Sequence, residues 1–248
     1  MEVKKIRDLT FIKIGENKTM VIACDSCGSV GMKEGDSLKV NPFYTGKYTA
    51  RVGLLEVLCT GAEVVTVVDA ICNEMKNTGE KIIRGIEEEL NAAGIDRVVL
   101  TGSTEENFPT VSTALGITVV GIVETEVLKV NSVKANSIVV SIGLPKVGDE
   151  VKLSNDEDIV HYCDIQILLH TKGVYEIIPV GSKGIFDEAR QLAKNNGMRL
   201  AIDGNIKVDI NKSAGPSTVI IAAVSDKTLD NIKHLNNFNI IGSLIKIS

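Results

Sequence analysis

Acidic side chains in the first half of the chain have the placement expected of metal ligands. Asp25 ends a predicted strand, and Glu106 follows another predicted strand in a turn rich in Gly, Ser and Thr. Glu56 lies in an apolar helical stretch, where a buried carboxylate is costly unless something pairs with it. Carboxylates around one pocket suit a hard cation such as Mg²⁺, which takes its other ligands from water and phosphate. Asp25, Glu56 and Glu106, with Glu105 beside it, are therefore the candidate metal ligands, although for Glu56 by itself a rim position or a buried ion pair to Arg51 or Lys47 is the favoured interpretation.

The turn from Asp25 to Lys33 (DSCGSVGMK) has the composition of an anion-binding loop. Its small residues let backbone N–H groups approach a phosphate closely. Lys33 adds a positive point charge. The alternative is a mobile polar loop, and the turn by itself does not decide between the two.

Several common motifs are missing from the chain. There is no GxxxxGK[ST], no GxGxxG after a strand, no GxSxG and no HExxH, so a Walker-type loop, a dinucleotide fold and a zinc protease are not supported. The segment 161–164 contains His, Cys and Asp and has a metal cluster as one interpretation, but an exposed His at a strand edge is the favoured one. Cys24 and Cys27 form a single CxxC without a second pair, which favours ordinary thiols over a zinc or redox site.

Hydrophobic patterning predicts a mixed α+β chain without the strict alternation of a doubly wound sheet. Strands are predicted at residues 8–14, 19–24, 64–68, 98–101, 117–124, 137–142, 165–169, 218–224 and 240–247, and helices at 47–60, 79–93, 185–195 and 227–235. A domain boundary is expected near 125–135, which gives domains 1–130 and 131–248.

The composition is that of a globular protein and excludes several classes. The chain has 248 residues, of which 44% are hydrophobic, and is long enough for one large or two small domains. Aromatic residues make up 4%, Trp is absent and the net charge is −5, so a nucleic-acid-binding surface is not expected. No signal peptide or membrane-spanning run is found. We expect a cytoplasmic protein whose five cysteines are reduced.

An ordered set of segments resembles the aminoimidazole ribonucleotide (AIR) synthetase superfamily. Cys24–Lys33 resembles that family's "TDGVGTK" segment, and Glu56–Ala62 (EVLCTGA) is similar to its "NDLLVQGA" helix, with Glu56 in place of a metal-binding Asp. Thr101–Asn107 (TGSTEEN) resembles "GGETAEM". Gly181–Glu188 (GSKGIFDE) resembles the "SDGL" segment of thiamine-monophosphate kinase, a member of the same superfamily. Together these segments extend over nearly the whole chain.

The resemblance implies a fold and an activity. Members of the superfamily have two mixed α/β domains, and the first domains of two subunits join their sheets into a barrel in a homodimer. They use ATP and Mg²⁺ to activate or phosphorylate a small molecule. The wording of the motifs is most similar to the α-ribazole kinase branch, which phosphorylates the nucleoside of the lower cobalamin ligand. The expected function is therefore an ATP- and Mg²⁺-dependent kinase acting on a nucleoside-like substrate.

The resemblance also implies residue roles. Lys33 and Lys183 are the expected catalytic residues. The nucleotide is expected on Gly28, Gly31, Lys33, Gly102, Ser103 and Thr104. Asp69 and Asp36 are candidates for the general base, or else are structural or lie in the water shell of the metal.

Three departures from the family pattern limit this transfer. Ser103 stands where the family has an acidic residue, so one metal ligand is lost or moves to Glu105 or Glu106. Glu56 replaces an Asp, and Lys183 replaces the Asp of "SDGL". Another ATP-dependent activity of the superfamily and a non-catalytic nucleotide-binding dimer therefore stay open as alternatives.

Overall fold

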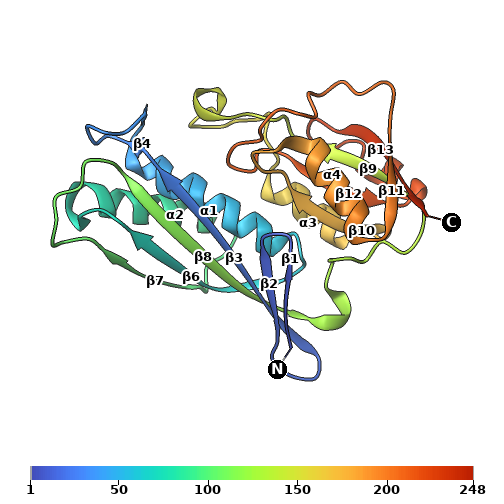
Figure 1. Cartoon of the computed structure of the whole chain (residues 1–248), viewed down its shortest axis with the longest axis horizontal. Helices are drawn as coiled ribbons and strands as arrows, with labels where there is room; N and C mark the ends of the chain where they lie inside the picture. Colours follow the sequence, from blue (N-terminus) through green and yellow to red (C-terminus); the bar gives the residue numbers. More distant parts are fainter. Residues whose placement is uncertain (1, 248) are drawn as a thin grey trace. The chain divides into compact units, whose positions relative to one another are not determined.

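The computed structural model describes residues 2–247, and the chain divides into two compact units (Figure 1). The first unit contains the described residues up to Leu58 together with Ala62–Val127. The second contains Cys59–Gly61 and the described residues from Leu128 onward. Each unit has its own sheet and its own helices, and each is described by itself.

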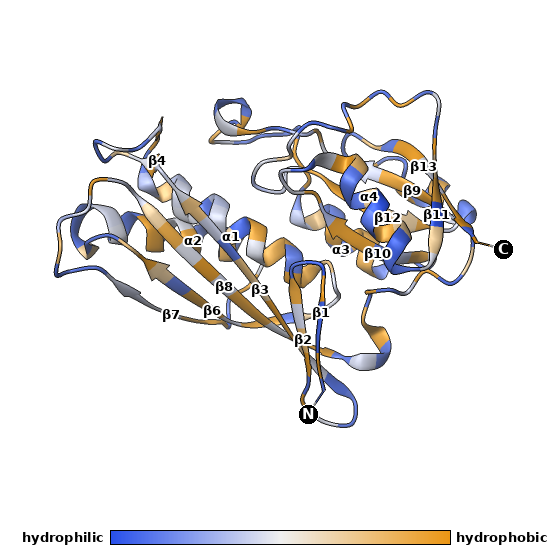
Figure 2. Ribbon diagram, viewed as in Figure 1, coloured by the Kyte–Doolittle hydropathy of each residue, from blue (hydrophilic) through white to orange (hydrophobic). Residues whose placement is uncertain are grey.

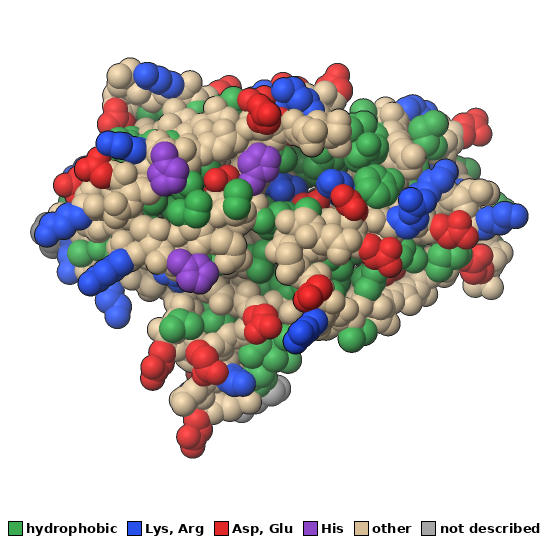
Figure 3. Space-filling view, turned by 180° about the vertical axis from the view of Figure 1, so that it is seen from behind, with side chains coloured by type: hydrophobic (Ala, Val, Ile, Leu, Met, Phe, Trp, Pro, Cys, Tyr) green, Lys and Arg blue, Asp and Glu red, His purple; other side chains and the backbone are tan. Residues whose placement is uncertain are grey.

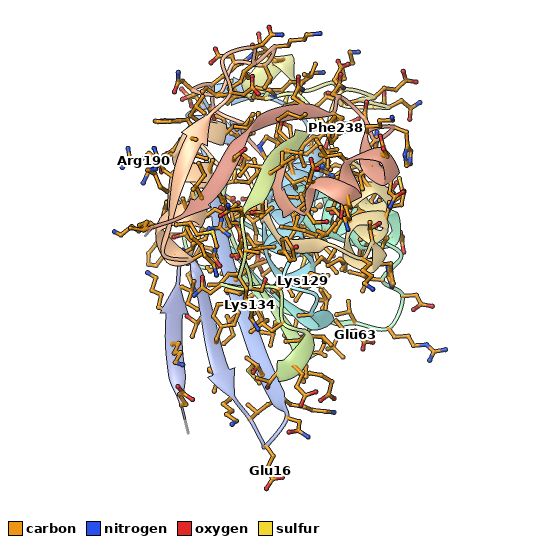
Figure 4. All side chains as sticks on the ribbon, turned by 90° about the vertical axis from the view of Figure 1, so that its right-hand side faces the viewer. Glu16, Glu63, Lys129, Lys134, Arg190 and Phe238 are labelled. Carbon is orange, nitrogen blue, oxygen red and sulfur yellow. The ribbon has the colours of Figure 1, made fainter. Side chains whose placement is uncertain are left out.

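A six-stranded sheet forms the first unit, and its central strands carry most of the candidate site. The order is β1 (Val3–Ile6), β2 (Leu9–Lys13), β3 (Lys18–Gly28), β8 (Ala114–Glu124), β6 (Glu63–Ile71) and β7 (Val99–Thr104). Neighbours are antiparallel except β6 and β7, whose parallel pairing requires the crossover through η1 (Met75–Gly79) and α2 (Glu80–Ala92). Glu16 lies at the tip of the turn between β2 and β3 (Figure 4). The short strands β4 (Val30–Gly31) and β5 (Leu38–Lys39) form a separate parallel pair.

Two helices, α1 (Pro42–Leu58) and α2, cover one face of this sheet (Figure 1). They cross closely because glycines meet backbone at the contact. A Cβ on Gly46 would lie 2.0 Å from the carbonyl oxygen of Ile82, and one on Gly85 would lie 1.9 Å from that of Phe43. Arg51 of α1 also pairs with Glu89 of α2 at 3.5 Å, inside the contact.

Side chains alternate between the two faces of the central strands. On β3, Val21 and Ala23 are buried beneath the helices, and on β8 Ile117 and Val119 are buried on the same face. Figure 2 shows the hydrophobic residues that run along β8 in this unit and along β10 in the other. The period of two therefore decides which residues of each strand can reach the helix-covered face.

The second unit is built on a five-stranded antiparallel sheet. Its order is β10 (Val174–Pro179), β12 (Ile220–Val224), β9 (Ser137–Ile142), β13 (Asn239–Lys246) and β11 (Met198–Ile202). Its helices are α3 (Tyr162–His170), α4 (Gly184–Asn195) and α5 (Leu229–Ile232), with the short turns η3 (Gly148–Glu150) and η4 (Asp226–Thr228). The buried face of α4 (Ile185, Ala189 and Leu192) packs in one core with strands β9, β12 and β13. Along the chain, β8 is followed by η2 (Thr125–Val127) and then by the segment that carries Lys129 and Lys134, labelled in Figure 4, before β9 begins.

One predicted element is wrong. Residues 165–169 form part of helix α3 and not a strand. A short apolar run fits either structure, and here Ile165 and Leu168 are buried while Ile167 and His170 are exposed, which is helical spacing. The helix begins after His161, whose backbone N–H donates to the Asp164 carboxylate at 2.9 Å. The mixed α+β class itself is confirmed.

Candidate functional site

Two carboxylates of the first unit lie in one register row across the sheet. Asp25 of β3 is opposite Ile117 of β8, and Ile117 is opposite Asp69 of β6. Gly102 of β7 is opposite Asp69 and completes the row. Residues directly opposite one another project from the same face of a sheet. Because Ile117 is buried beneath the helices, Asp25 and Asp69 both project from the helix-covered face, one on each side of it.

Both carboxyl groups are in surroundings that disfavour their ionised form. Asp25 is partly buried, and burial raises the pKa of its carboxyl against a hydrogen bond from the backbone of Ser26. Asp69 is 5% exposed, and burial likewise raises the pKa of its carboxyl, opposed only by its own backbone N–H. A cation placed beside such a pair supplies the missing counter-charge and favours ionisation of both groups.

Gly102 leaves the space that the Asp69 carboxylate occupies. A Cβ built on Gly102 would lie 2.2 Å from Oδ1 of Asp69. No side chain fits there unless Asp69 moves. Ser103, the next residue, pairs with Ala70 and is exposed, so by strand alternation it projects from the opposite face.

Asp36 fixes the loop that carries Lys33. One carboxylate oxygen accepts the backbone N–H of Thr113 at 2.6 Å, and the other accepts the Thr113 hydroxyl at 2.7 Å and the Lys33 backbone N–H at 2.8 Å. Burial opposes ionisation of Asp36, yet these hydrogen bonds and the charge of Lys39 leave the pKa of its carboxyl below the ordinary value. Gly31 packs against the same group, since a Cβ there would lie 2.7 Å from Asp36 Oδ2. Asp36 is thus engaged in holding the loop.

Lys33 reaches across to the end of β6. Its Nζ lies 2.7 Å from Oε2 of Glu74 and 3.2 Å from the carbonyl oxygen of Thr110. Glu74 comes five residues after Asp69, a span of at most about 16 Å along an extended strand. Lys33 is therefore assigned to a second group, which it forms with Glu74 beyond the end of β6.

Glu106 belongs to this second group. Its Oε1 accepts the backbone N–H of Met75 at 2.8 Å and the hydroxyl of Thr104 at 2.9 Å. Its other oxygen, Oε2, has no hydrogen-bond partner among the residues described. Glu105 closes its own turn by accepting the backbone N–H groups of Asn107 and Phe108.

Glu56 is paired with a residue that the sequence did not single out. Its Oε1 lies 3.3 Å from Nη2 of Arg7, and both side chains are largely buried. Arg7 is in the two-residue connection between β1 and β2 and has a φ of 55°. The buried ion pair expected as the alternative is present, but its cation is Arg7, whereas Arg51 and Lys47 both lie near Glu89.

The remaining predicted residues lie outside these groups. Gly28 is exposed at the end of β3, and nothing lies within 4 Å of the position its Cβ would take. Lys183 is exposed before the first residue of α4, in the second unit. Cys24 and Cys27 are three residues apart on β3, so by strand alternation their side chains project from opposite faces. Within residues 2–247, no group of three or more His, Cys, Asp and Glu side chains is gathered as a metal site.

Sequence reasoning undervalued two residues, Asp69 and Glu74. The sequence predicts Asp69 as a general base, a structural residue or a water-shell ligand of the metal, and it does not single out Glu74. Their position in the sequence could have indicated them. Asp69 and Glu74 follow the apolar run of β6 toward its carboxyl end, just as Glu106 follows the apolar run of β7. The partners of both residues come from distant segments and cannot be read from local sequence.

Comparison with known proteins finds a family similarity in the first unit. Residues 7–123 match the family model described as AIR synthase related protein, N-terminal domain. This segment is similar to AIR synthase related N-terminal domains. It contains the Asp25–Asp69 row, the Lys33 loop and the Glu56–Arg7 pair, and the match agrees with the superfamily resemblance expected from the sequence.

Solved structures share this fold over nearly the whole chain. PurL of Thermotoga maritima complexed with ATP has a TM-score of 0.69 and 14% identity, over 96% of this chain and 42% of PurL. Thiamine-monophosphate kinase from Stenotrophomonas maltophilia has a TM-score of 0.66 and 14% identity, over 98% and 90% of the two chains. AaThiL complexed with AMPPCP and TMP has a TM-score of 0.67 and 13% identity, over 97% and 85%. The likeness shows the fold, which confirms the expected fold class.

Three further facts delimit the comparison. The chain spans less than half of PurL, the first of these structures. Comparison with curated proteins finds none that matches the sequence. In the part of the chain that is described, no helix is long and apolar enough to cross a membrane.

On the face seen in Figure 3, basic and acidic side chains are interspersed.

Proposed function

We propose that the protein is an ATP- and Mg²⁺-dependent phosphotransferase that acts on a small nucleoside-like molecule. The observation that carries the proposal is the Asp25–Asp69 row. Its two carboxyl groups have a pKa raised by burial, and both lie on the helix-covered face of a domain similar to AIR synthase related N-terminal domains. Similar folds solved with ATP and with AMPPCP support a nucleotide as the ligand. Phosphoryl transfer depends mainly on positioning and on neutralising spreading negative charge, which such groups can do.

The donor set fits Mg²⁺. Asp25 and Asp69 supply oxygen atoms, and Mg²⁺ characteristically takes one or two carboxylates together with water and phosphate oxygens. Glu106 keeps an unengaged oxygen and is the next ligand we propose. Glu56, also proposed from the sequence, must first exchange Arg7 for the metal. When bound, the metal neutralises phosphate charge.

The other roles belong to cationic and backbone groups. Lys33 binds a phosphate oxygen, and the backbone N–H groups around Gly28, Gly31 and Gly102, with Ser103 and Thr104, bind the rest of the nucleotide. Lys183, before the N-terminus of the twelve-residue helix α4, contributes positive charge toward the transferred group.

The acceptor that we propose is α-ribazole, in salvage of the lower cobalamin ligand in the cytoplasm. Purified protein is incubated with γ-labelled ATP, Mg²⁺ and a panel containing α-ribazole, other nucleosides and thiamine monophosphate. Label on α-ribazole alone is the expected result. Label on thiamine monophosphate alone favours the alternative of a thiamine-phosphate-kinase-like enzyme, and ATP hydrolysis without any labelled acceptor contradicts the kinase proposal.

We also propose a homodimer formed through the uncovered face of the first sheet. Val65 and Val68 of β6 are each 37% exposed on strands whose other face is buried, and an uncovered apolar sheet face favours pairing with a second copy. Sedimentation at micromolar concentration checks this. A monomer there contradicts the homodimer proposal.

A second candidate is a nucleotide-binding dimer that does not turn over. It is favoured by the Arg7–Glu56 pair, which engages one proposed ligand, and by Ser103, which replaces an acidic residue. Calorimetric titration with Mg·ATP, followed by a test for slow hydrolysis, separates the two. Binding with no hydrolysis and no transfer supports this second candidate.

A further inference from the structure

The ammonium of Lys33 is held by two acceptors and has one donor to spare. Nζ donates to Oε2 of Glu74 at 2.7 Å and to the carbonyl oxygen of Thr110 at 3.2 Å. An ammonium carries three N–H donors, and no third acceptor is present within residues 2–247. The side chain is 18% exposed, so the remaining N–H is open to solvent or to a ligand.

Glu74 is itself fixed in place. Its Oε1 accepts the hydroxyl of Thr78, its Oε2 lies 3.5 Å from the hydroxyl of Thr110, and its carbonyl oxygen accepts the Gly79 N–H at 2.9 Å. The preceding residue, Asn73, is fully buried and ties this end of β6 to the 110–114 segment through three hydrogen bonds. Glu74 therefore offers Lys33 a rigid anchor and not a mobile surface charge.

The backbone of Lys33 is fixed from the other side. Its N–H donates to Asp36, and Gly35 of the same loop donates to the carbonyl oxygen of Val111 at 2.7 Å. A lysine side chain tied at both ends has already lost most of its rotamer freedom. A ligand that contacts it does not incur that ordering cost again.

We propose that Glu74 is the positioning residue for Lys33, holding the ammonium so that its third N–H faces an anionic ligand. The inference rests on the proposed function, which takes this anion to be a phosphate group of ATP. Glu74 also offsets the charge of the lysine, so the loop carries no isolated cation before the ligand binds. Nothing in the sequence motifs points to this residue, because its partner lies 41 positions away.

The test measures how fast single lysines are acylated by an N-hydroxysuccinimide ester, read by mass spectrometry of peptides. Wild type, Glu74→Gln and the matched control Glu88→Gln are compared without nucleotide. Glu88 is an exposed glutamate of α2, so its substitution removes the same charge away from Lys33. Exposed Lys5 is the internal reference. Loss of a partly buried ion pair predicts about fivefold faster acylation of Lys33 in Glu74→Gln and no change in Glu88→Gln.

Two further arms keep the outcomes distinct. Where Glu74→Gln fails to fold by circular dichroism, Glu74→Asp, which shortens the reach but keeps the charge, must still speed the acylation of Lys33. An unchanged rate in a folded variant overturns the positioning role. Added Mg·ATP should slow acylation of Lys33 in the wild type and slow it less in Glu74→Gln. If Mg·ATP does not slow the acylation of Lys33 but Glu74→Gln still speeds it, the positioning role stands and ATP is the wrong ligand.

Discussion

At the scale of single residues, Asp69 is a buried carboxylate that makes no ion pair with any residue from 2 to 247. Because its pKa is raised on folding, its contribution to stability falls as the pH rises from the unfolded pKa through the folded pKa. At pH 7 the ionised form is therefore a burden on the free protein. The same charge becomes useful once a metal-bound phosphate is beside it.

Replacing Asp69 separates these two effects. In Asp69→Asn the charge is lost and the shape is kept, so the variant should melt at the same or a higher temperature at pH 7. Turnover of Mg·ATP should fall by about 100-fold or more, as when a charge-stabilising group is removed from an active site. Melting curves and an ATPase assay check both parts, with exposed Asp96→Asn as the control. A variant with normal turnover contradicts the metal proposal.

The pKa of the Asp36 carboxyl is shifted in the opposite direction from that of Asp69, so its effect on stability with pH is also opposite. A carboxyl whose pKa is lower in the folded chain stabilises it above the ordinary value of 3.8 and loses this contribution as the pH falls through the folded pKa. Asp36→Asn should cost about 1.5–3 kcal/mol at pH 7, because two charge-assisted hydrogen bonds to one oxygen are lost. Urea unfolding at pH 7 and at pH 3 measures the difference, which should shrink in acid. A gap that stays constant with pH contradicts the assignment.

At the scale of elements, Gly85 allows helices α1 and α2 to pack as closely as they do. In an isolated helix, Ala in place of Gly stabilises by about 1 kcal/mol. Here the new Cβ would lie 1.9 Å from the carbonyl oxygen of Phe43, so the helices must separate. Gly85→Ala should therefore destabilise the protein, by about 1–3 kcal/mol. Urea titration measures this against Glu88→Ala on the exposed face of the same helix, and a stabilised Gly85→Ala would contradict the close contact.

The elements were predictable where the pattern is local and strong. Strand β8 alternates cleanly, and α2 has apolar residues at helical spacing closed by Gly94, so both were expected near their observed bounds. Helix α3 was not predicted as a helix, because its few apolar residues fit a strand equally well. The contact that starts the helix, between the His161 backbone N–H and the Asp164 carboxylate, exists only in the folded turn. Strand β10 was missed because a Gly and a Pro flank its short apolar run.

At the scale of the whole molecule, the site depends on register, which no local pattern encodes. Asp25 and Asp69 are 44 positions apart in sequence and come into one row only through β8, which comes after both in the chain and contributes Ile117 between them. The motif residues were individually visible, but the sequence did not reveal that Glu56 pairs with Arg7 or that Lys33 pairs with Glu74. Such pairs are set by long-range packing. The fold and the family resemblance therefore followed from ordered motifs, whereas the groupings within the site required coordinates.

The two compact units provide a test of which proposed residues meet the nucleotide. Asp25, Asp69, Lys33 and Glu106 all belong to the first unit, and Lys183 belongs to the second. A ligand stabilises only the folded units that it contacts, by about 2.7 kcal/mol at 100 times its dissociation constant. Scanning calorimetry with a non-hydrolysable Mg·ATP analogue should therefore raise the transition of the first unit. If Lys183 binds the transferred group, the second transition rises as well in the wild type but not in Lys183→Ala, whereas a second transition that never moves removes Lys183 from the site.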